Sequence, residues 1–307
     1  MILSASRRTD LPALYGEWLM GRLRAGFALV PGPRSPHTLR RVTLTPDVVD
    51  CIVFWSKNPQ PFLRFLPEIE RMGYPFYFQF TLNPYNGEVE RCLPPLRERL
   101  EIFHRLSAQI GPERLVWRYD PVIVAERYPP GWHVEQFDRL CAVLHRDTCR
   151  CVFSFFDRYA KDQSGFYEAD GASMRTVAQG FSQIAAQYGL PLFACSEPVD
   201  LSGYGIQHAA CIDAALVEQV IGCPVKDRKD PNQRPLCGCM ESVELGSYDS
   251  CTNGCVYCYA NQGLERARRR LQQNDPRSPL MIGWPDGTEK IVDVPAQSLR
   301  LMQTTLF

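Results

Sequence analysis

Short apolar runs alternate with longer amphipathic segments through the first two thirds of the chain. Six of these runs have the length and the β-branched or aromatic content of strands, and each is followed by a segment with helical spacing of its apolar positions. The expected strands are residues 2–6, 51–55, 75–81, 114–119, 150–156 and 191–195. The expected helices are residues 11–25, 61–72, 94–110, 134–146, 173–188 and 212–221. Because parallel strands need crossover helices, the pattern predicts an α/β fold with a parallel sheet.

Polar residues follow every expected strand. No Gly-x-Gly-x-x-Gly segment follows the first strand, which argues against a dinucleotide-binding sheet, so we expect a partial or full (β/α) barrel. Barrel enzymes build their sites from the carboxyl ends of the strands. Each polar group is also explained as the start of a loop, but together they favour a mouth that binds a ligand. The candidate lining residues are Arg7, Arg8, Asp10, Lys57, Asn58, Arg118, Asp120, Asp157 and Glu197.

The alternation stops after Gly222. The next forty residues are rich in Cys, Gly, Pro and Asn, with little apolar periodicity, so something other than an apolar core must order them. The last thirty or so residues contain four prolines and are expected to wrap over the surface. We therefore divide the chain into an α/β barrel core at 1–222, a cysteine-rich iron–sulfur segment at 223–275 that completes the barrel, and a surface tail at 276–307.

Composition excludes several classes of protein. The 307 residues are 45% hydrophobic and 22% charged, as in folded globular proteins, and 34 basic residues balance 34 acidic ones. No apolar stretch approaches the ~20 residues of a membrane span, and the amino terminus lacks a secretory signal. We therefore expect a cytoplasmic protein with no membrane partner. In that reducing compartment, the 13 cysteines call for an explanation other than disulfides.

Cys251, Cys255 and Cys258 are the most specific feature, with C-x3-C-x2-C spacing. Three thiolates on one tight loop can hold three corners of a [4Fe–4S] cluster and leave one iron open to a substrate or cofactor. Gly254 allows the loop to turn closely. Tyr257, directly before the last cysteine, is placed to stack on a flat ligand.

Four further cysteines suit a second [4Fe–4S] cluster or a zinc ion, namely Cys195, Cys211, Cys237 and Cys239. Two alternatives remain open. Cys195 and Cys211 are also explained as small buried hydrophobes, and Cys237 or Cys239 would instead complete a four-thiolate zinc site with the three loop cysteines. The cysteines scattered through the strand-and-helix region are expected in the core, namely Cys51, Cys92, Cys141, Cys149 and Cys151.

The cysteine spacing with its aromatic residue resembles the motif of the radical S-adenosylmethionine superfamily, whose fold is a partial or full α/β barrel. The resemblance implies that Cys251, Cys255 and Cys258 ligate a [4Fe–4S] cluster whose open iron binds S-adenosylmethionine. It also implies an external electron donor and a 5′-deoxyadenosyl radical that abstracts hydrogen from a substrate. The candidate cofactor-binding residues are Tyr257, Lys57, Asn58, Arg118 and Asp120.

The position of the motif departs from that superfamily, because here it follows the last expected strand instead of the first. Two stretches nevertheless resemble the spore photoproduct lyase-like branch, namely residues 51–59 and residues 98–106 leading to 119–123. We therefore expect a circular permutation in which residues 243–246 supply the strand that begins other members and close the barrel from the far end. The whole chain also resembles the family named domain of unknown function 1848, through residues 4–10, 237–239 and 255–261.

The chain ends in Gln303-Thr-Thr-Leu-Phe307, which resembles the pentapeptide by which DNA-repair and replication proteins dock on the bacterial sliding clamp. Leu306 and Phe307 would fill an apolar pocket while Gln303 hydrogen-bonds at its rim. The alternative is that Leu306 and Phe307 pack on this protein's own barrel. A helix expected at 265–273 carries Arg266 to Arg270, which are placed either to contact phosphates or to form a solvated face.

The sequence thus predicts a radical S-adenosylmethionine enzyme of unknown reaction. A nucleic-acid lesion or modified base is the candidate substrate, since the lyase-like branch includes an enzyme that repairs a DNA lesion. The alternative is a zinc-stabilised barrel that binds nucleic acid or the clamp without radical chemistry.

Overall fold

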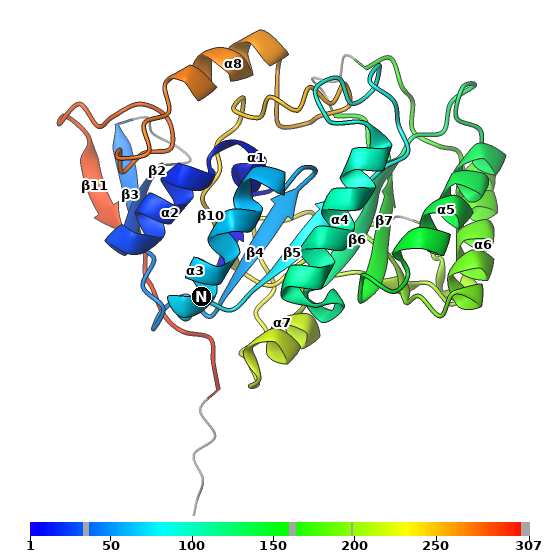
Figure 1. Ribbon diagram of the computed structural model, residues 1–307, viewed down its shortest axis with the longest axis horizontal. Helices are drawn as coiled ribbons and strands as arrows, with labels where there is room; N and C mark the ends of the chain where they lie inside the picture. The colour runs from blue at the N-terminus through cyan, green and yellow to red at the C-terminus, as the bar shows by residue number, and fades with distance from the viewer. Residues whose placement is uncertain (33–36, 160–163, 198, 302–307) are drawn as a thin grey trace, which may run out of the picture.

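The structure, a computed structural model, describes residues 1–32, 37–159, 164–197 and 199–301. Its main element is an eight-stranded sheet in the order β10-β1-β4-β5-β6-β7-β8-β9, with every neighbouring pair parallel (Figure 1). The predicted α/β fold with a parallel sheet is confirmed. The strands are β1 (Ile2–Ala5), β4 (Cys51–Ser56), β5 (Phe76–Thr81), β6 (Leu115–Val122), β7 (Arg150–Phe155), β8 (Leu192–Ala194), β9 (Gln207–His208) and β10 (Ser242–Glu244).

Helices occur wherever the apolar periodicity predicts one, with two local differences. The first predicted helix is divided at Tyr15, whose φ of −129° lies outside the helical region. The second begins as a 3-10 helix, η1 (Gln60–Phe65), before it becomes regular. The helices are α1 (Leu11–Leu14), α2 (Gly16–Ala25), α3 (Leu66–Arg71), α4 (Leu96–Ile110), α5 (Pro130–Leu144), α6 (Gly171–Gln187), α7 (Ala214–Ile221) and α8 (Leu264–Gln272).

The two faces of the main sheet have different neighbours. Side chains alternate along a strand, so Leu3 and Phe54 belong to the core shared with the helices, while Ile2 and Val53 face the other side. Figure 1 shows α3, α4, α5 and α6 on one face of the sheet. The opposite face packs against α7 and against residues of the cysteine-rich segment, among them Met240. The large helices therefore cover only one face of the sheet, and α7 with the cysteine-rich segment covers the other.

The strand expected at 243–246 is present as β10, which pairs in parallel with β1. Within the part of the chain that the structure describes, β10 and β9 form the two edges of the sheet and no pairing joins them, so a full barrel is excluded while the open parallel sheet is consistent with the partial barrel. Both edge strands are very short, with three residues in β10 and two in β9, so neither offers a ladder long enough to close the sheet.

A second, three-stranded sheet is not predicted by the sequence pattern. In it β3 pairs antiparallel with β2 and parallel with β11, which comes from the tail. The tail contacts the rest of the chain along its path: the Leu29 N–H donates to the Pro279 carbonyl (2.9 Å), and the Lys226 N–H donates to the Leu299 carbonyl (2.8 Å). The strands are β2 (Phe27–Pro31), β3 (Thr38–Thr43) and β11 (Lys290–Asp293).

His133 is buried in α5 with both ring nitrogens occupied. Its Nε2 lies 2.8 Å from the Ile123 carbonyl and its Nδ1 lies 2.9 Å from the Tyr119 hydroxyl. The carbonyl can only accept, so Nε2 carries the proton and Nδ1 accepts from the tyrosine, which is the neutral tautomer. Burial lowers the pKa of His133 to about 4.

This histidine predicts a loss of stability in mild acid. The imidazole has a pKa of about 6.5 in the unfolded chain and about 4 in the folded protein, so below pH 6.5 the proton binds the unfolded state preferentially. The free energy of unfolding therefore falls between pH 6.5 and 4, by about 2 kcal/mol at pH 5 from this group alone. Urea unfolding of the wild type and of His133→Gln at pH 7.5 and pH 5 measures it. Equal losses in the two proteins would contradict this assignment.

Candidate functional site

A cavity of about 450 Å³ lies at the carboxyl ends of the main-sheet strands. Residues that directly follow β1, β4, β7 and β8 line it, together with the end of β6, as the barrel argument predicts. Most of the candidate lining residues are present in its wall, namely Arg7, Arg8, Asp10, Lys57, Arg118, Asp120 and Asp157. Asn58 and Glu197 do not line it. Both sets of cysteines named from the sequence do, namely Cys251, Cys255, Cys258, Cys195, Cys211, Cys237 and Cys239.

The loop that carries Cys251, Cys255 and Cys258, hereafter the cysteine loop, is held by backbone pairing with residues 89–92. The Cys92 N–H donates to the Asn253 carbonyl (3.0 Å), and the Val256 N–H donates to the Val89 carbonyl (2.9 Å). Gly254 has a φ of +69°. A Cβ added there would lie 3.1 Å from the Cys92 Sγ, so both the conformation and the close approach favour glycine.

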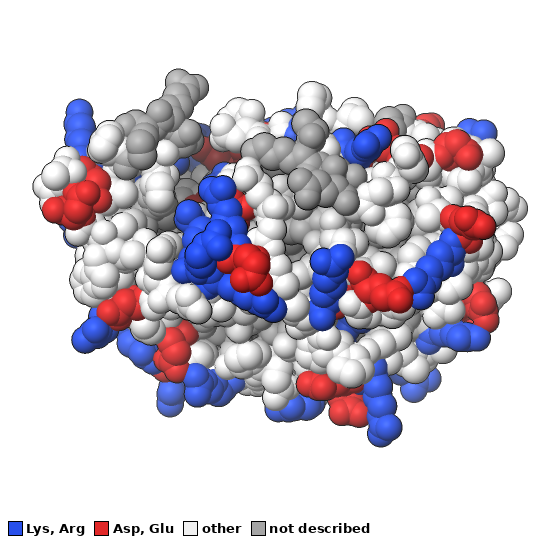
Figure 2. Space-filling model, turned by 90° about the horizontal axis from the view of Figure 1, so that it is seen from above, with Lys and Arg blue, Asp and Glu red and all other residues white. Residues whose placement is uncertain are grey.

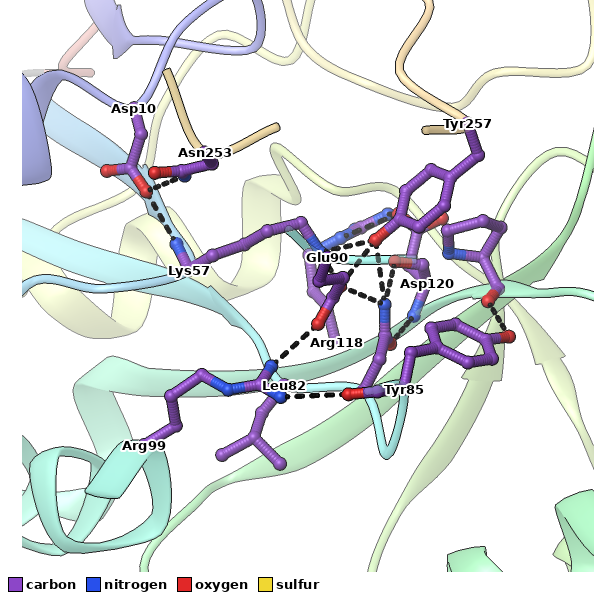
Figure 3. A network of polar contacts seen from close by, with 12 residues as sticks. Asp10, Lys57, Leu82, Tyr85, Glu90, Arg99, Arg118, Asp120, Asn253 and Tyr257 are labelled. Carbon is purple, nitrogen blue, oxygen red and sulfur yellow. Dashed lines mark hydrogen bonds and ion pairs between the residues drawn. The ribbon is translucent and has the colours of Figure 1, made fainter. Parts of the chain in front are cut away.

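Asp10 fastens the cysteine loop to the sheet (Figure 3). Its Oδ2 accepts hydrogen bonds from Asn253 Nδ2 (2.9 Å) and from the Lys57 N–H (2.8 Å). Its Oδ1 accepts from Ser56 Oγ (2.7 Å) and from the Ala13 N–H, which caps α1. One buried carboxylate therefore fixes the loop relative to the ends of β1 and β4. Burial raises the pKa of Asp10, and these four donors oppose that effect.

The three thiols of the cysteine loop form a donor set that suits a metal centre. Burial raises the pKa of Cys251 to about 12 and raises the pKa of Cys255 and Cys258 as well. Nearby backbone N–H groups oppose this for Cys258, and the Lys57 ammonium opposes it for Cys255. Positive charge from a bound metal stabilises such thiolates, and hydrogen bonds to sulfur tune iron–sulfur clusters.

Among the residues that the structure describes, no three Cys, His, Asp or Glu side chains are already grouped closely enough to hold a single metal ion. A [4Fe–4S] cluster has a different requirement, since its thiolates bind separate irons at its corners. The cysteine loop, which lines a cavity large enough to admit a group of several atoms, meets that requirement by its chemistry and its position.

Glu90 is the centre of a buried network beside the cysteine loop (Figure 3). Its Oε1 accepts from Lys57 Nζ (3.0 Å) and from the Tyr257 hydroxyl (2.5 Å), and its Oε2 accepts from Arg99 Nη1 (2.8 Å). Lys57 Nζ also lies 2.9 Å from the Tyr257 hydroxyl. Burial would raise the pKa of Glu90, but Lys57 and Arg99 bring it below its usual value. The network fixes the orientation of Tyr257 by its hydroxyl.

Glu90 and Arg99 were not identified from the sequence. Glu90 lies in a segment without periodicity, so no local pattern marks it. Arg99 carries a recognisable signal: it shares the apolar face of α4 with Ile102, Phe103 and Leu106, and a charged side chain in such a face needs a buried partner.

Arg118 and Asp120 form a second polar group in the cavity wall. Arg118 Nε donates to Asp120 Oδ2 (3.1 Å), and Asp120 Oδ1 accepts from Ser154 Oγ (2.6 Å). Arg118 Nη1 lies 2.8 Å from the Sγ of Cys211. The structure thus brings this pair beside the second cysteine set, whereas Lys57 and Tyr257 lie beside the cysteine loop.

The remaining candidate residues have structural partners. The Asn58 N–H donates to Ser56 Oγ (3.1 Å), and Asp157 pairs with Arg234. Glu197 accepts from the Phe155 N–H (2.8 Å), and burial raises its pKa to about 8.

The scattered cysteines are mostly buried as expected. Cys51, Cys141 and Cys151 are buried and Cys149 is half-buried. The expectation for Cys92 is wrong: it is exposed, because the segment that pairs with the cysteine loop leaves the buried interior after Glu90, and both Arg91 and Cys92 face solvent.

The arginines of α8 lie at the surface. Figure 1 places α8 on the side of the sheet where the strands end, and Figure 2 shows basic side chains gathered on that face. Arg266 pairs with Asp249 (3.1 Å) and Arg268 with Glu265 (2.6 Å). The expected clamp-docking residues Gln303, Leu306 and Phe307 lie outside the described residues. None of the described helices has the length and apolar content that crossing a membrane requires.

No curated protein and no solved structure matches the chain. One protein-family model does, over residues 2–260, a range that includes the whole main sheet, the cysteine loop and the second cysteine set. The chain therefore belongs to the family described as Domain of unknown function (DUF1848).

Proposed function

We propose that this protein is a radical S-adenosylmethionine enzyme whose [4Fe–4S] cluster is held by Cys251, Cys255 and Cys258. The observation that carries the proposal is that these thiols line, from one tight loop, a cavity at the carboxyl ends of a parallel sheet. When bound, the cluster supplies the electron that cleaves S-adenosylmethionine and so starts hydrogen abstraction from a substrate.

The strand order supports the circular permutation. If the chain is followed from β10, each strand of the main sheet lies beside the next one in sequence, β10, β1, β4, β5, β6, β7 and β8. In that order the cysteine loop follows the first strand, as it does in the superfamily that the motif resembles. In that order, β1 follows β10 and the cysteine loop and so lies inside the chain.

The chain's own residues hold the cysteine loop in place and line the cavity that would receive the cofactor and the substrate. Asp10 and Asn253 fix the cysteine loop, and Lys57 places a positive charge near Cys255. We assign Lys57 and Tyr257 to the cofactor side of the cavity. The assignment of Arg118 and Asp120 to the cofactor stays a prediction from the sequence, and Trp55, whose ring lies 5.5 Å from the Arg118 guanidinium in the same cavity wall, is assigned to the substrate. The basic α8 on the same side of the molecule supports a nucleic-acid lesion or modified base as substrate class.

Anaerobic purification and reconstitution test the proposal, with iron, sulfide and zinc counted per chain. In the same preparation, conversion of S-adenosylmethionine to 5′-deoxyadenosine is measured with and without dithionite. About four or more irons per chain, with dithionite-dependent cleavage, are expected. Zinc without iron and no cleavage would overturn the enzyme and leave a zinc-stabilised binding module. Iron and sulfide with intact S-adenosylmethionine would leave an electron carrier.

A further inference from the structure

Four buried cysteines from separate parts of the chain have neighbouring side chains. The Sγ atoms of Cys195 and Cys211 lie 3.1 Å apart. Cys239 Sγ accepts from the N–H of Ile212, the residue after Cys211, at 3.4 Å, and Cys237 lies two residues before Cys239, so the four thiols form a row in the cavity wall. All four line the cavity.

Backbone hydrogen bonds fix the three segments that carry this row. The Ala209 N–H donates to the Ala194 carbonyl (2.7 Å), and the Met240 N–H donates to the Ile212 carbonyl (2.9 Å). The Ile212 N–H also points to the Cys239 Sγ, at 3.4 Å.

Two sheet residues fix the centre of the row. The carbonyl of Cys211 accepts from the Tyr77 hydroxyl (3.0 Å) and from Gln79 Nε2 (2.7 Å). Tyr77 and Gln79, together with these backbone hydrogen bonds, therefore hold the cysteines in place. Cysteines that only fill an apolar core do not require such anchoring.

Two arginines share this part of the cavity wall. Arg118 Nη1 is 2.8 Å from Cys211 Sγ. The Arg118 and Arg7 guanidinium groups both lie over the Trp55 ring, at 5.5 Å and 5.0 Å from its centre, which brings both cations to this side of the cavity. Cations beside thiols favour the thiolate, which is the form that binds metals.

The chain around Cys237 and Cys239 has no helix or strand of its own. Between the end of α7 at Ile221 and the start of β10 at Ser242, the described chain contains only isolated bridges, such as that between Lys229 and Met240. Such a stretch needs another source of order, and bound metal provides it in many small cysteine-rich segments.

We propose that Cys195, Cys211, Cys237 and Cys239 bind a second metal centre with four thiolate ligands, in the wall of the same cavity as the cysteine loop. Zinc and a [4Fe–4S] cluster share this ligand chemistry. Zinc requires the four thiols to move together around one ion, since no three of the described side chains are so grouped, whereas a cluster binds each thiolate at a separate iron, and the metal count distinguishes the two. The proposal does not depend on radical chemistry at the cysteine loop, and its test does not use that activity.

The first experiment removes the cysteine loop's thiols. The variant Cys251→Ala/Cys255→Ala/Cys258→Ala, purified anaerobically and reconstituted, is expected to retain about one zinc, or about four irons with sulfide, per chain. Adding Cys211→Ala and Cys239→Ala should remove that metal. Adding Cys223→Ala instead, at a half-buried cysteine outside the cavity, should leave it. A metal-free triple variant with native circular dichroism would overturn the proposal.

The second experiment uses the unaltered protein, so it does not depend on whether a variant folds. Iodoacetamide labelling is followed by mass spectrometry before and after treatment with a strong chelator. All four cysteines are expected to resist labelling at first and to react after chelation without any added reductant. Cysteines that chelation leaves unchanged would overturn the proposal, as would cysteines that react only after a disulfide reductant is added.

Discussion

Replacing Cys255 with alanine should abolish dithionite-dependent formation of 5′-deoxyadenosine, with a fall of at least about 100-fold in rate. Each thiolate of a three-cysteine loop binds a different iron, so the two remaining cysteines cannot hold the cluster at the cavity. The backbone of Cys255 forms an isolated antiparallel bridge with that of Glu90, and the Lys57 ammonium is close enough to act on the Cys255 thiol. The measurement is product formation by the reconstituted variant under anaerobic conditions, with iron counted in the same sample.

Cys92→Ala is the matched control for this variant. Cys92 lies against the same loop, with its Sγ close to Gly254, but it is exposed and does not line the cavity. We expect the control to keep its iron and its activity. If Cys255→Ala retained full cleavage of S-adenosylmethionine, or if both variants lost activity equally, Cys255 would not be a cluster ligand.

The main sheet could be predicted because each of its strands carries its own signal. Phe76–Thr81 is a short aromatic-rich run interrupted only by Gln79, and α4 after it repeats its apolar residues with helical spacing. Neither signal depends on distant residues. The second sheet could not be found in this way: β3 has two central arginines, and its partner β11 comes from residues about 250 positions further along the chain.

The sequence predicted which residues would line the site, but not which partners their side chains would contact. The rule that strand ends meet at one edge correctly placed Lys57 and Arg118 in one cavity wall. It could not show that Lys57 turns to Glu90 while Arg118 turns to Cys211, because those partners are distant in sequence. Spacing identified the cysteine loop for the opposite reason, since its three thiols are neighbours in the chain.

Replacing Glu90 with glutamine should lower the free energy of unfolding by about 3 to 5 kcal/mol. Glu90 is 1% exposed and neutralises two cations, Lys57 and Arg99, of which Arg99 is itself 2% exposed. A neutral amide can accept a hydrogen bond from one of them but cannot compensate their charge. An uncompensated buried charge is far more costly than the loss of an exposed pair.

Urea unfolding at neutral pH checks this result, with Glu88→Gln as the matched control. Glu88 is two residues away, but it is 66% exposed and pairs with Arg127, which is 60% exposed, so its loss should leave the free energy of unfolding nearly unchanged. The segment that carries Glu90 also pairs with the cysteine loop, so the folded Glu90→Gln protein should bind less iron after reconstitution than the control. Equal stability and equal iron content in the two variants would show that the network neither stabilises the fold nor positions the loop.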